Sequence, residues 1–239
     1  MTVSKIPLGE YQVTKDGKVI KYCLENITSQ VKMDEALEHM INYFLPREPL
    51  SKYLDVCSDE PSKNSVKKLW AEALQDGHAI GAYLLNSNGT IGRLIGTNII
   101  IVSNKNAPHD EILQLEGEQF QIIFKTFKSL MERVDVYDRY GVDEYLEGLG
   151  LSVHPEYHGC NLGYRILESR EKLCKALGLN VAVTMFTAAS SQHIARKLGY
   201  ETLVEIDYDE VKIEGRYPYR GIWEKMKEKK FTLMALEFK

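Results

Sequence analysis

The segment from residue 151 to residue 167 contains the residues whose types and spacing most clearly permit chemistry. An extended apolar run from Tyr145 to Val153 leads into a loop with Gly159 and Gly163, and a helix-patterned stretch follows. A glycine-bearing loop between a strand and a helix leaves backbone N–H groups without partners at the positive end of the helix dipole. Such a loop can bind a phosphate or a pyrophosphate group.

Three kinds of phosphate loop compete for this segment. A P-loop ends in Gly-Lys-Ser or Gly-Lys-Thr, so that a lysine and a hydroxyl reach the phosphates and magnesium, and this loop has no such ending. A dinucleotide fold needs G-x-G-x-x-G near the start of a βαβ unit, and only two glycines are present here. The third kind holds the pyrophosphate arm of an acyl-coenzyme A, and the surrounding residues support it.

The loop resembles a known motif. Residues 153–163, Val-His-Pro-Glu-Tyr-His-Gly-Cys-Asn-Leu-Gly, resemble motif A of the GNAT N-acetyltransferase superfamily, V-x-x-x-x-(R/Q)-x-x-G-x-(G/A). Residues 44–50, Phe-Leu-Pro-Arg-Glu-Pro-Leu, are similar to the F-x-x-x-E-P-L segment of insect arylalkylamine N-acetyltransferases, and residues 187–200 resemble their next helix and strand. The resemblance covers most of residues 20–238. It implies a GNAT fold, acetyl-CoA as co-substrate and direct transfer to a small primary amine in a ternary complex.

The resemblance also implies which residues hold acetyl-CoA. They are Leu151, Val153, His158, Gly159, Cys160, Asn161, Leu162, Gly163, Tyr164 and Lys197. Two of them depart from motif A, because His158 stands where the family has Arg or Gln and Asn161 stands where it has Gly. Asn is the non-glycine residue that best tolerates left-handed backbone geometry, so we expect the loop to form. His158 supplies a backbone N–H but no fixed positive charge, which predicts weaker coenzyme A binding.

Acetyl transfer to an amine makes three demands on a site. The protonated amine, with a pKa of about 10, must lose a proton before it attacks. The thioester carbonyl needs a donor where negative charge develops, and the leaving thiolate needs stabilisation or a proton. Glu48 is the candidate general base, acting directly or through water. It lies between Pro46 and Pro49 after an apolar helical stretch, which predicts a partly desolvated carboxylate. Without the resemblance, an exposed loop glutamate is an equal alternative.

Two hydroxyl residues complete the catalytic set that the resemblance implies. Thr187 and Ser191 match residues with catalytic or binding roles in the insect family. From the sequence alone, helix capping is the favoured role for Ser190 or Ser191. Ala195 stands where many superfamily members have a tyrosine that acts as general acid, so protonation of the thiolate needs another donor in this chain.

Several apolar or aromatic residues are candidates for an acceptor pocket that would suit an aromatic amine, although core packing is the default for each of them. They are Phe44, Leu45, Leu50, Tyr53, Leu149, Met185 and Phe186. We predict no metal site, because no Cys, His or carboxylate group has zinc spacing and Pro155 separates His154 from His158.

The rest of the sequence supplies the elements that position these residues. Period-two alternation and turn residues predict a hairpin over 11–27 and strands over 79–85, 90–102, 145–153, 180–186, from 200 and over 231–238. Helical spacing predicts helices over 33–44, 62–76, 111–140 with a break near 135, from the loop to 177, and over 190–197. Together with the resemblance, this predicts an α/β fold with a mixed, mostly antiparallel twisted sheet flanked by helices. No linker-like stretch divides residues 1–239, which favours one domain.

Composition narrows the range of partners. The net charge of −4 and the lack of a dense basic cluster argue against general nucleic-acid binding. No signal peptide or membrane-spanning apolar run is present, and the four widely spaced cysteines are typical of reduced thiols in a cytoplasmic protein. The resemblance implies a small amine as the partner, and no pattern indicates an oligomeric state. The alternative is an acyl-CoA-binding protein with a GNAT fold and little catalysis, which His158, Asn161 and Ala195 motivate.

Overall fold

A computed structural model describes residues 4–107 and 116–239. One sheet of eight strands runs through these residues, in the order β1-β2-β3-β4-β5-β6-β8-β7. The strands are β1 (Pro7–Lys15), β2 (Lys18–Asn26), β3 (Ile80–Leu85), β4 (Ile91–Asn104), β5 (Glu144–Val153), β6 (Val181–Phe186), β7 (Glu201–Asp207) and β8 (Lys230–Glu237). Every neighbouring pair is antiparallel except β5 with β6. The mixed, mostly antiparallel sheet is therefore confirmed, whereas the one-domain organisation stays a prediction.

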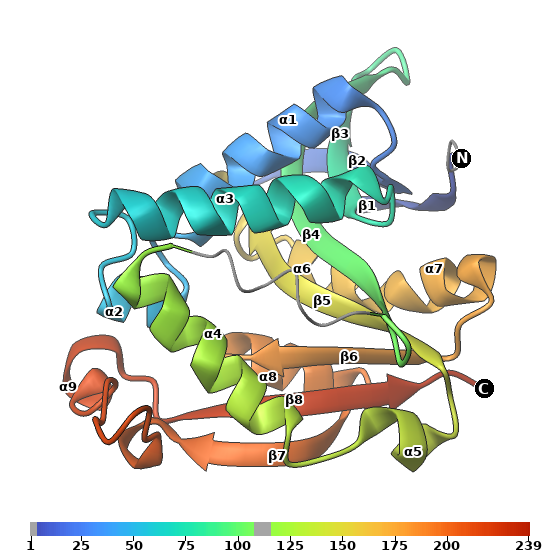
Figure 1. Cartoon of the computed structure of the whole chain (residues 1–239). Helices are drawn as coiled ribbons and strands as arrows, with labels where there is room; N and C mark the ends of the chain where they lie inside the picture. The colour runs from blue at the N-terminus through green and yellow to red at the C-terminus, as the bar shows by residue number, and fades with distance from the viewer. Residues whose placement is uncertain (1–3, 108–115) are drawn as a thin grey trace.

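Helices cover both faces of the sheet (Figure 1). One face carries α1 (Gln30–His39), the π-helical turn η1 (Met40–Phe44), α3 (Glu60–Gln75) and α4 (Glu118–Met131). The other face carries α6 (Leu162–Glu168), α7 (Arg170–Leu177) and α8 (Ala189–Lys197). Shorter helical segments join these elements: α2 (Pro49–Tyr53), α5 (Val136–Tyr140), η3 (Pro155–Tyr157), η4 (Tyr208–Glu210) and α9 (Ile222–Met226).

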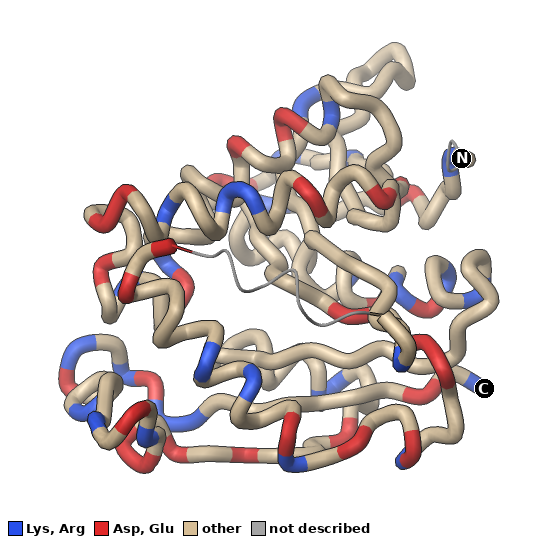
Figure 2. Tube along the Cα trace, in the orientation of Figure 1, with Lys and Arg blue, Asp and Glu red and all other residues tan. Residues whose placement is uncertain are grey.

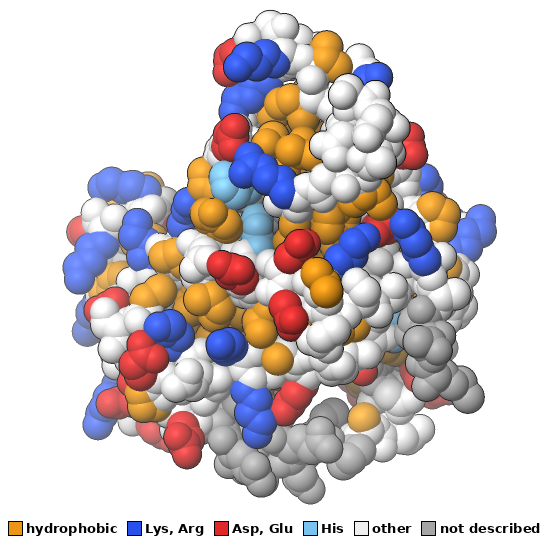
Figure 3. Space-filling model, turned by 90° about the horizontal axis from the view of Figure 1, so that it is seen from above, with side chains coloured by type: hydrophobic (Ala, Val, Ile, Leu, Met, Phe, Trp, Pro, Cys, Tyr) orange, Lys and Arg blue, Asp and Glu red, His pale blue; other side chains and the backbone are white. Residues whose placement is uncertain are grey.

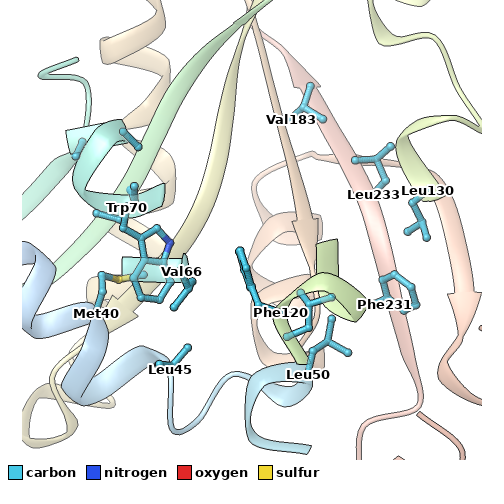
Figure 4. Close-up of a cluster of buried hydrophobic side chains, with 14 of the residues drawn as sticks. Met40, Leu45, Leu50, Val66, Trp70, Phe120, Leu130, Val183, Phe231 and Leu233 are labelled. Atoms are coloured by element: carbon cyan, nitrogen blue, oxygen red, sulfur yellow. The ribbon is translucent and has the colours of Figure 1, made fainter. Parts of the chain in front are cut away.

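Two hydrophobic clusters hold the layers together, one on each face of the sheet. On the α1/α3/α4 face, Phe120 of α4 lies between a group around Trp70 and a group around Phe231 (Figure 4). The other cluster joins α6, α7 and α8 to the sheet and includes the fully buried Ile166 and Leu173. Burial of apolar surface at about 25 cal/mol per Å² makes these two interfaces the main source of stability. Lys and Arg are interspersed with Asp and Glu along the outer elements (Figure 2).

The sheet opens between β5 and β6. The two strands pair only from Leu146–Ala182 to Gly148–Thr184. Beyond this point β5 stays paired with β4 as far as Val153, while β6 stays paired with β8 as far as Phe186. Figure 1 shows the two strands diverging. A bulge in β5, between its pairs with Ile99 and Ile100, lies where the opening begins. This is where the sheet can admit an extended ligand.

Some predicted elements differ in detail. The first residues of the helix predicted over 111–140 lie outside the described residues. The remainder forms α4 and α5, which confirms the predicted break near residue 135. The division occurs because the Asp135 side chain accepts a hydrogen bond from the Asp138 N–H, at 3.0 Å, and so caps a new helix. The helix predicted to reach residue 177 divides at Ser169 into α6 and α7. Neither α2 nor α9 was predicted, because both span only five residues. Within 4–107 and 116–239, no helix is long and apolar enough to span a membrane.

Candidate functional site

The loop after β5 adopts the left-handed geometry that motif A requires. Asn161 has φ +59° and ψ 15°, and it precedes the first residue of α6. Gly159 has φ +81°. Asn161 therefore takes the conformation for which the family pattern uses glycine, as predicted. The cost is small because Asn is enriched in this region of backbone space.

The loop N–H groups fall into two sets. The N–H of His158 donates to the Pro155 carbonyl at 3.1 Å, and that of Cys160 donates to the Tyr157 carbonyl at 3.2 Å. The prediction that the His158 N–H is offered to a ligand is therefore wrong for this structure, because η3 already uses it. The N–H groups of Gly159 and of residues 161–164 have no acceptor within the described parts of the chain. These five donors are the ones a pyrophosphate could use.

Three side chains, those of Lys15, His158 and Lys197, contact the loop or lie beside it. The Lys15 ammonium at the β1–β2 hairpin donates to the carbonyls of Glu156 and His158, at 2.7 and 2.9 Å. The His158 ring lies 3.1 Å from the Val153 carbonyl oxygen. The Lys197 ammonium lies 5.4 Å from the centre of the Tyr164 ring. Two cations that are distant in sequence therefore lie beside the loop, although His158 itself carries no fixed charge.

The other predicted cofactor residues lie around the same loop. Leu151 and Val153 are half-buried at the end of β5. A side chain at Gly163 would meet Ile194 and Leu151 only at ordinary contact distance, so α6 packs against α8 and β5 at this point. Cys160 and Leu162 are buried in the second hydrophobic cluster. Cys160 thus faces the protein interior, which agrees with the expectation that it is not a nucleophile.

Glu48 is buried at the N-terminus of α2, with 9% of its surface exposed. Pro49 begins the helix without an N–H of its own, and the Glu48 carboxylate accepts the next two, from Leu50 at 3.1 Å and Ser51 at 2.7 Å. The Ser51 hydroxyl donates to the same oxygen, also at 2.7 Å. The alternative of an exposed loop glutamate is therefore wrong. A carboxylate has about four acceptor positions, so Oε1 keeps room for another donor.

The pKa values of three further groups, to which the sequence assigned no role, respond to the charge of Glu48. Burial, and then the negative charge of Glu48, raise the pKa of Tyr208 well above its ordinary value. Burial and the Glu48 charge also raise the pKa of Tyr219, and the Tyr219 ring packs 5.9 Å from that of Tyr208. Burial and Glu48 raise the pKa of the Glu228 carboxyl. The negative charge of Glu48 therefore acts on two buried phenols and on a second carboxyl group.

Thr187 and Ser191 lie close to these groups but do not cap α8. The Tyr208 hydroxyl donates to the Thr187 carbonyl at 2.6 Å, which ties the end of β6 to η4. The N-cap of α8 is Ala188, and the Ser191 hydroxyl donates to its carbonyl at 2.8 Å. The first helical N–H, of Ala189, donates instead to Glu228 at 2.8 Å. The predicted capping role of Ser190 or Ser191 is therefore wrong, because a carboxylate from a distant segment takes that place.

Proteins of known structure share the fold described above. No family model matches the sequence. The crystal structure of "insect putative arylalkylamine N-Acetyltransferase 7" from the yellow fever mosquito Aedes aegypti has a TM-score of 0.88 and 26% identity, over 99% of this chain and 96% of that chain. The chain has the GNAT acyltransferase fold. Arylalkylamine N-acetyltransferase 2 of A. aegypti (TM-score 0.77, 22% identity) and the polyamine N-acetyltransferase of Drosophila melanogaster (TM-score 0.73, 18% identity) share it. Each match covers 91% of this chain, with 99% and 100% of the other chain.

Within this GNAT fold, Ala195 is fully buried in the cluster between α8 and the sheet. The position that provides a tyrosine in many superfamily members is thus closed by packing in this chain. The phenol that lies beside Thr187 is that of Tyr208 in η4, which donates a hydrogen bond to the Thr187 carbonyl. No sequence signal pointed to Tyr208, because only the β7–β8 connection brings it there.

The predicted acceptor-pocket residues divide into core and edge. Leu45, Leu50 and Phe186 are buried, which agrees with the default of core packing. Phe44, Tyr53, Leu149 and Met185 are half-buried against the first cluster. The aromatic segment over 217–223 also divides, because Tyr219 is buried beside Tyr208 whereas Tyr217 and Trp223 are 40% and 48% exposed.

Histidines gather near the end of β5 without forming a metal site. On the face seen from above, histidine side chains lie among hydrophobic and basic ones (Figure 3). Tyr43 packs between the rings of His39 and His154, at 4.9 and 4.5 Å, and His39 Nε2 lies 3.2 Å from the Ser152 hydroxyl. Burial, with smaller contributions from His154 and Arg47, lowers the pKa of His39 to about 4. No group of three or more His, Cys, Asp or Glu in the described part of the chain could hold a metal ion.

Proposed function

We propose that this chain is an acetyl-CoA-dependent N-acetyltransferase that acts on a small primary amine by direct transfer. The observation that carries the proposal is the opening between β5 and β6, next to a loop with five unused N–H groups. The near full-length likeness to the mosquito protein supports an acyltransferase activity. The four free cysteines suit a cytoplasmic location, which is part of the proposal.

Acetyl-CoA would lie along the end of β5 and across the loop. Among residues 4–107 and 116–239, none pairs with β5 on its β6 side beyond Gly148, so this edge can hydrogen-bond an extended pantetheine arm as another strand would. The N–H groups of Gly159 and residues 161–164 would hold the pyrophosphate, with Lys15 and Lys197 adding positive charge nearby. These contacts would bring the thioester to the opening of the two strands.

Glu48 would accept a proton from the ammonium form of the substrate, directly or through water. The free amine nitrogen then attacks the thioester carbonyl carbon, the carbon–sulfur bond breaks, and the second proton of the nitrogen passes to the departing thiolate. Thr187, Ser191 and Tyr208 would assist near this path. The Tyr208 hydroxyl donates to the Thr187 carbonyl and the Ser191 hydroxyl donates to the Ala188 carbonyl, which ties the end of β6 to η4 and α8. Positioned proton transfer of this kind contributes about 10²- to 10⁴-fold to the rate.

An arylalkylamine is the substrate class that the site suits. Glu48 and Glu228 would provide negative charge for an ammonium group, while the half-buried Phe44 would provide aromatic surface. The mosquito protein with the TM-score of 0.88 is itself named for this substrate class.

A thiol-release assay with acetyl-CoA and a panel of amines tests the proposal. We expect release with at least one arylalkylamine, at a rate that rises with pH as the amine loses its proton. Failure of every arylalkylamine, together with turnover of an aliphatic polyamine, would move the substrate class but keep the reaction.

The second candidate function is acyl-CoA binding with little catalysis. Two observations favour it: α2 and Ser51 occupy three acceptor positions of Glu48, and Ala195 provides no acid. Calorimetry with acetyl-CoA separates the two functions. Binding without thiol release for any amine would establish the second function, whereas release with one amine would exclude it.

A further inference from the structure

Arg170, the first residue of α7, buries its charged side chain beside the sheet. Only 1% of its surface is exposed, and it is among the largest fully buried side chains. A guanidinium group stays charged in proteins, and burying such a charge is costly unless it is well paired. Within the described residues, no Asp or Glu forms an ion pair with Arg170. Its hydrogen-bond partners are neutral side chains.

These partners lie on strands that flank β5. Arg170 Nε donates to Asn98 Oδ1 of β4 at 2.9 Å, and Nη1 donates to the Thr184 hydroxyl of β6 at 2.6 Å. Between them the guanidinium crosses β5 at Gly148, where an added Cβ would lie 2.1 Å from Nη2. Only glycine leaves room for this crossing. Gly148 and Thr184 are the last paired residues before β5 and β6 diverge, so Arg170 spans the start of the opening.

The same network reaches the β5 bulge. Asn98, held by Arg170 through its amide oxygen, donates from Nδ2 to the Gly150 carbonyl at 2.7 Å. Gly150 has φ +148°, a conformation that glycine favours. The bulge therefore depends on a side chain whose orientation Arg170 fixes. On the other side of Gly148, Arg170 holds β6 through the Thr184 hydroxyl.

The surroundings of Arg170 offer no compensating charge. Burial raises the pKa of Tyr200, and Arg170 offsets part of that rise. Burial raises the pKa of Cys174 to about 12, so this thiol is neutral as well. Removing Arg170 alone would leave the Asn98 and Thr184 oxygens without their donor, which costs stability. A test of Arg170 must therefore separate an effect on turnover from an effect on folding.

We propose that Arg170 is a positioning residue for acyl transfer. By holding Asn98 and Thr184 on the two sides of Gly148, it fixes the backbone of both strands where the opening begins, and so fixes the donors and walls that receive the thioester. This inference rests on the proposed N-acetyltransferase function.

The test compares Arg170→Met and Arg170→Lys with the wild-type protein. Met fills a similar volume, and Lys keeps the charge but cannot donate in the two fixed directions of a guanidinium. We expect kcat to fall about 10- to 100-fold in both variants, because small misplacements of reacting groups have effects of this size. The acetyl-CoA Kd and the amine KM should change by less than about threefold, since the loop N–H groups and Glu48 are untouched. Thr184→Val keeps the shape of the side chain and removes one acceptor of Arg170, so it should give a smaller loss of kcat. This variant replaces the Arg170 variants in the test if those do not fold.

Chemical rescue separates positioning from general stability. In Arg170→Ala, guanidinium ion far below its denaturing range should restore part of kcat, and methylammonium should not. Arg139→Met, which removes an exposed arginine paired with Glu201, is the matched control and should keep wild-type kcat. A kcat for Arg170→Met within about twofold of wild type would overturn the proposal. So would a loss of kcat that matches the loss of folded protein and that guanidinium does not restore. If the wild-type chain releases no thiol with any amine, the proposed function fails first, independently of Arg170.

Discussion

The loop over 153–164 and the region around Glu48 are assembled in different ways. The loop offers backbone N–H groups from one continuous segment, and its geometry depends on local features such as the left-handed Asn161 and Gly159. The region around Glu48 combines side chains from α2, η4 and the segments before α8 and β8. Backbone donors in a local loop tolerate changes of side chain, whereas a cluster of distant side chains does not. We therefore expect binding to depend on the loop and turnover to depend on the region around Glu48.

The largest expected effect is a loss of turnover without a loss of acetyl-CoA binding when Glu48 is replaced. Glu48→Ala should lower kcat about 10²- to 10⁴-fold through loss of the base, and should leave the acetyl-CoA Kd unchanged. Loss of the α2 cap should also cost about 1 kcal/mol of stability. Glu48→Gln is the matched control, because its amide oxygen can still accept from the Ser51 N–H. Thiol release across a pH series measures the effect, and wild-type turnover in both variants would remove Glu48 from the mechanism.

The next effect concerns His39, which lies on the loop side of this comparison through Ser152 and the His154 ring contact. Its pKa falls to about 4 in the folded protein from 6.5, so the unfolded chain binds more protons between these values. The free energy of unfolding is therefore highest above pH 6.5, where His39 is neutral in both states. It falls as the pH falls toward 4, by about 3 kcal/mol in total. Urea unfolding of wild type and His39→Gln at neutral and acidic pH measures this. Equal acid sensitivity of the two proteins would contradict the prediction.

Asn161 tests whether the loop depends on local geometry alone. Asn161→Val places a β-branched residue at φ +59°, which should cost about 1–2 kcal/mol and raise the acetyl-CoA Kd about tenfold. Asn161→Gly, which restores the motif A residue, should bind acetyl-CoA at least as well as wild type. Calorimetry gives both values. Equal affinity in all three proteins would mean that the loop N–H groups do not bind the pyrophosphate.

The smallest effect concerns Lys197, whose side chain is exposed beside Tyr164. Lys197→Met should raise the acetyl-CoA Kd by about two- to fivefold at low salt, because an exposed cation contributes at most about 1 kcal/mol. The difference should disappear at high salt through screening, and Lys197→Arg should bind like wild type. A difference that persists at high salt would place Lys197 in direct, desolvated contact with the ligand.

Sequence patterns predicted the strands, most of the helices and the loop geometry, because each depends on residues that are near one another in the chain. Asn161 shows this well, since its tolerance of left-handed backbone is an intrinsic property. The predictions were wrong where a distant group competes with a local one. Ser190 and Ser191 have the right chemistry to cap α8, but Glu228 reaches Ala189 from the segment before β8. The His158 N–H is a different case, because the short helix η3 just before it provides a local acceptor, the Pro155 carbonyl.

The sequence by itself determined the glycine loop and the alternation that builds the sheet, since these follow from backbone preferences and apolar spacing over a few residues. The burial of Glu48 was left open by the sequence and decided by the tertiary structure. Only the tertiary structure decided what surrounds Glu48 and what crosses β5. The charge of Glu48 acts on Tyr208, Tyr219 and Glu228, and Arg170 donates hydrogen bonds to Asn98 and Thr184, across separations that no local pattern encodes. The physical reason is that burial and hydrogen bonding act between whatever groups packing brings together, whereas propensity acts only between neighbours in the chain.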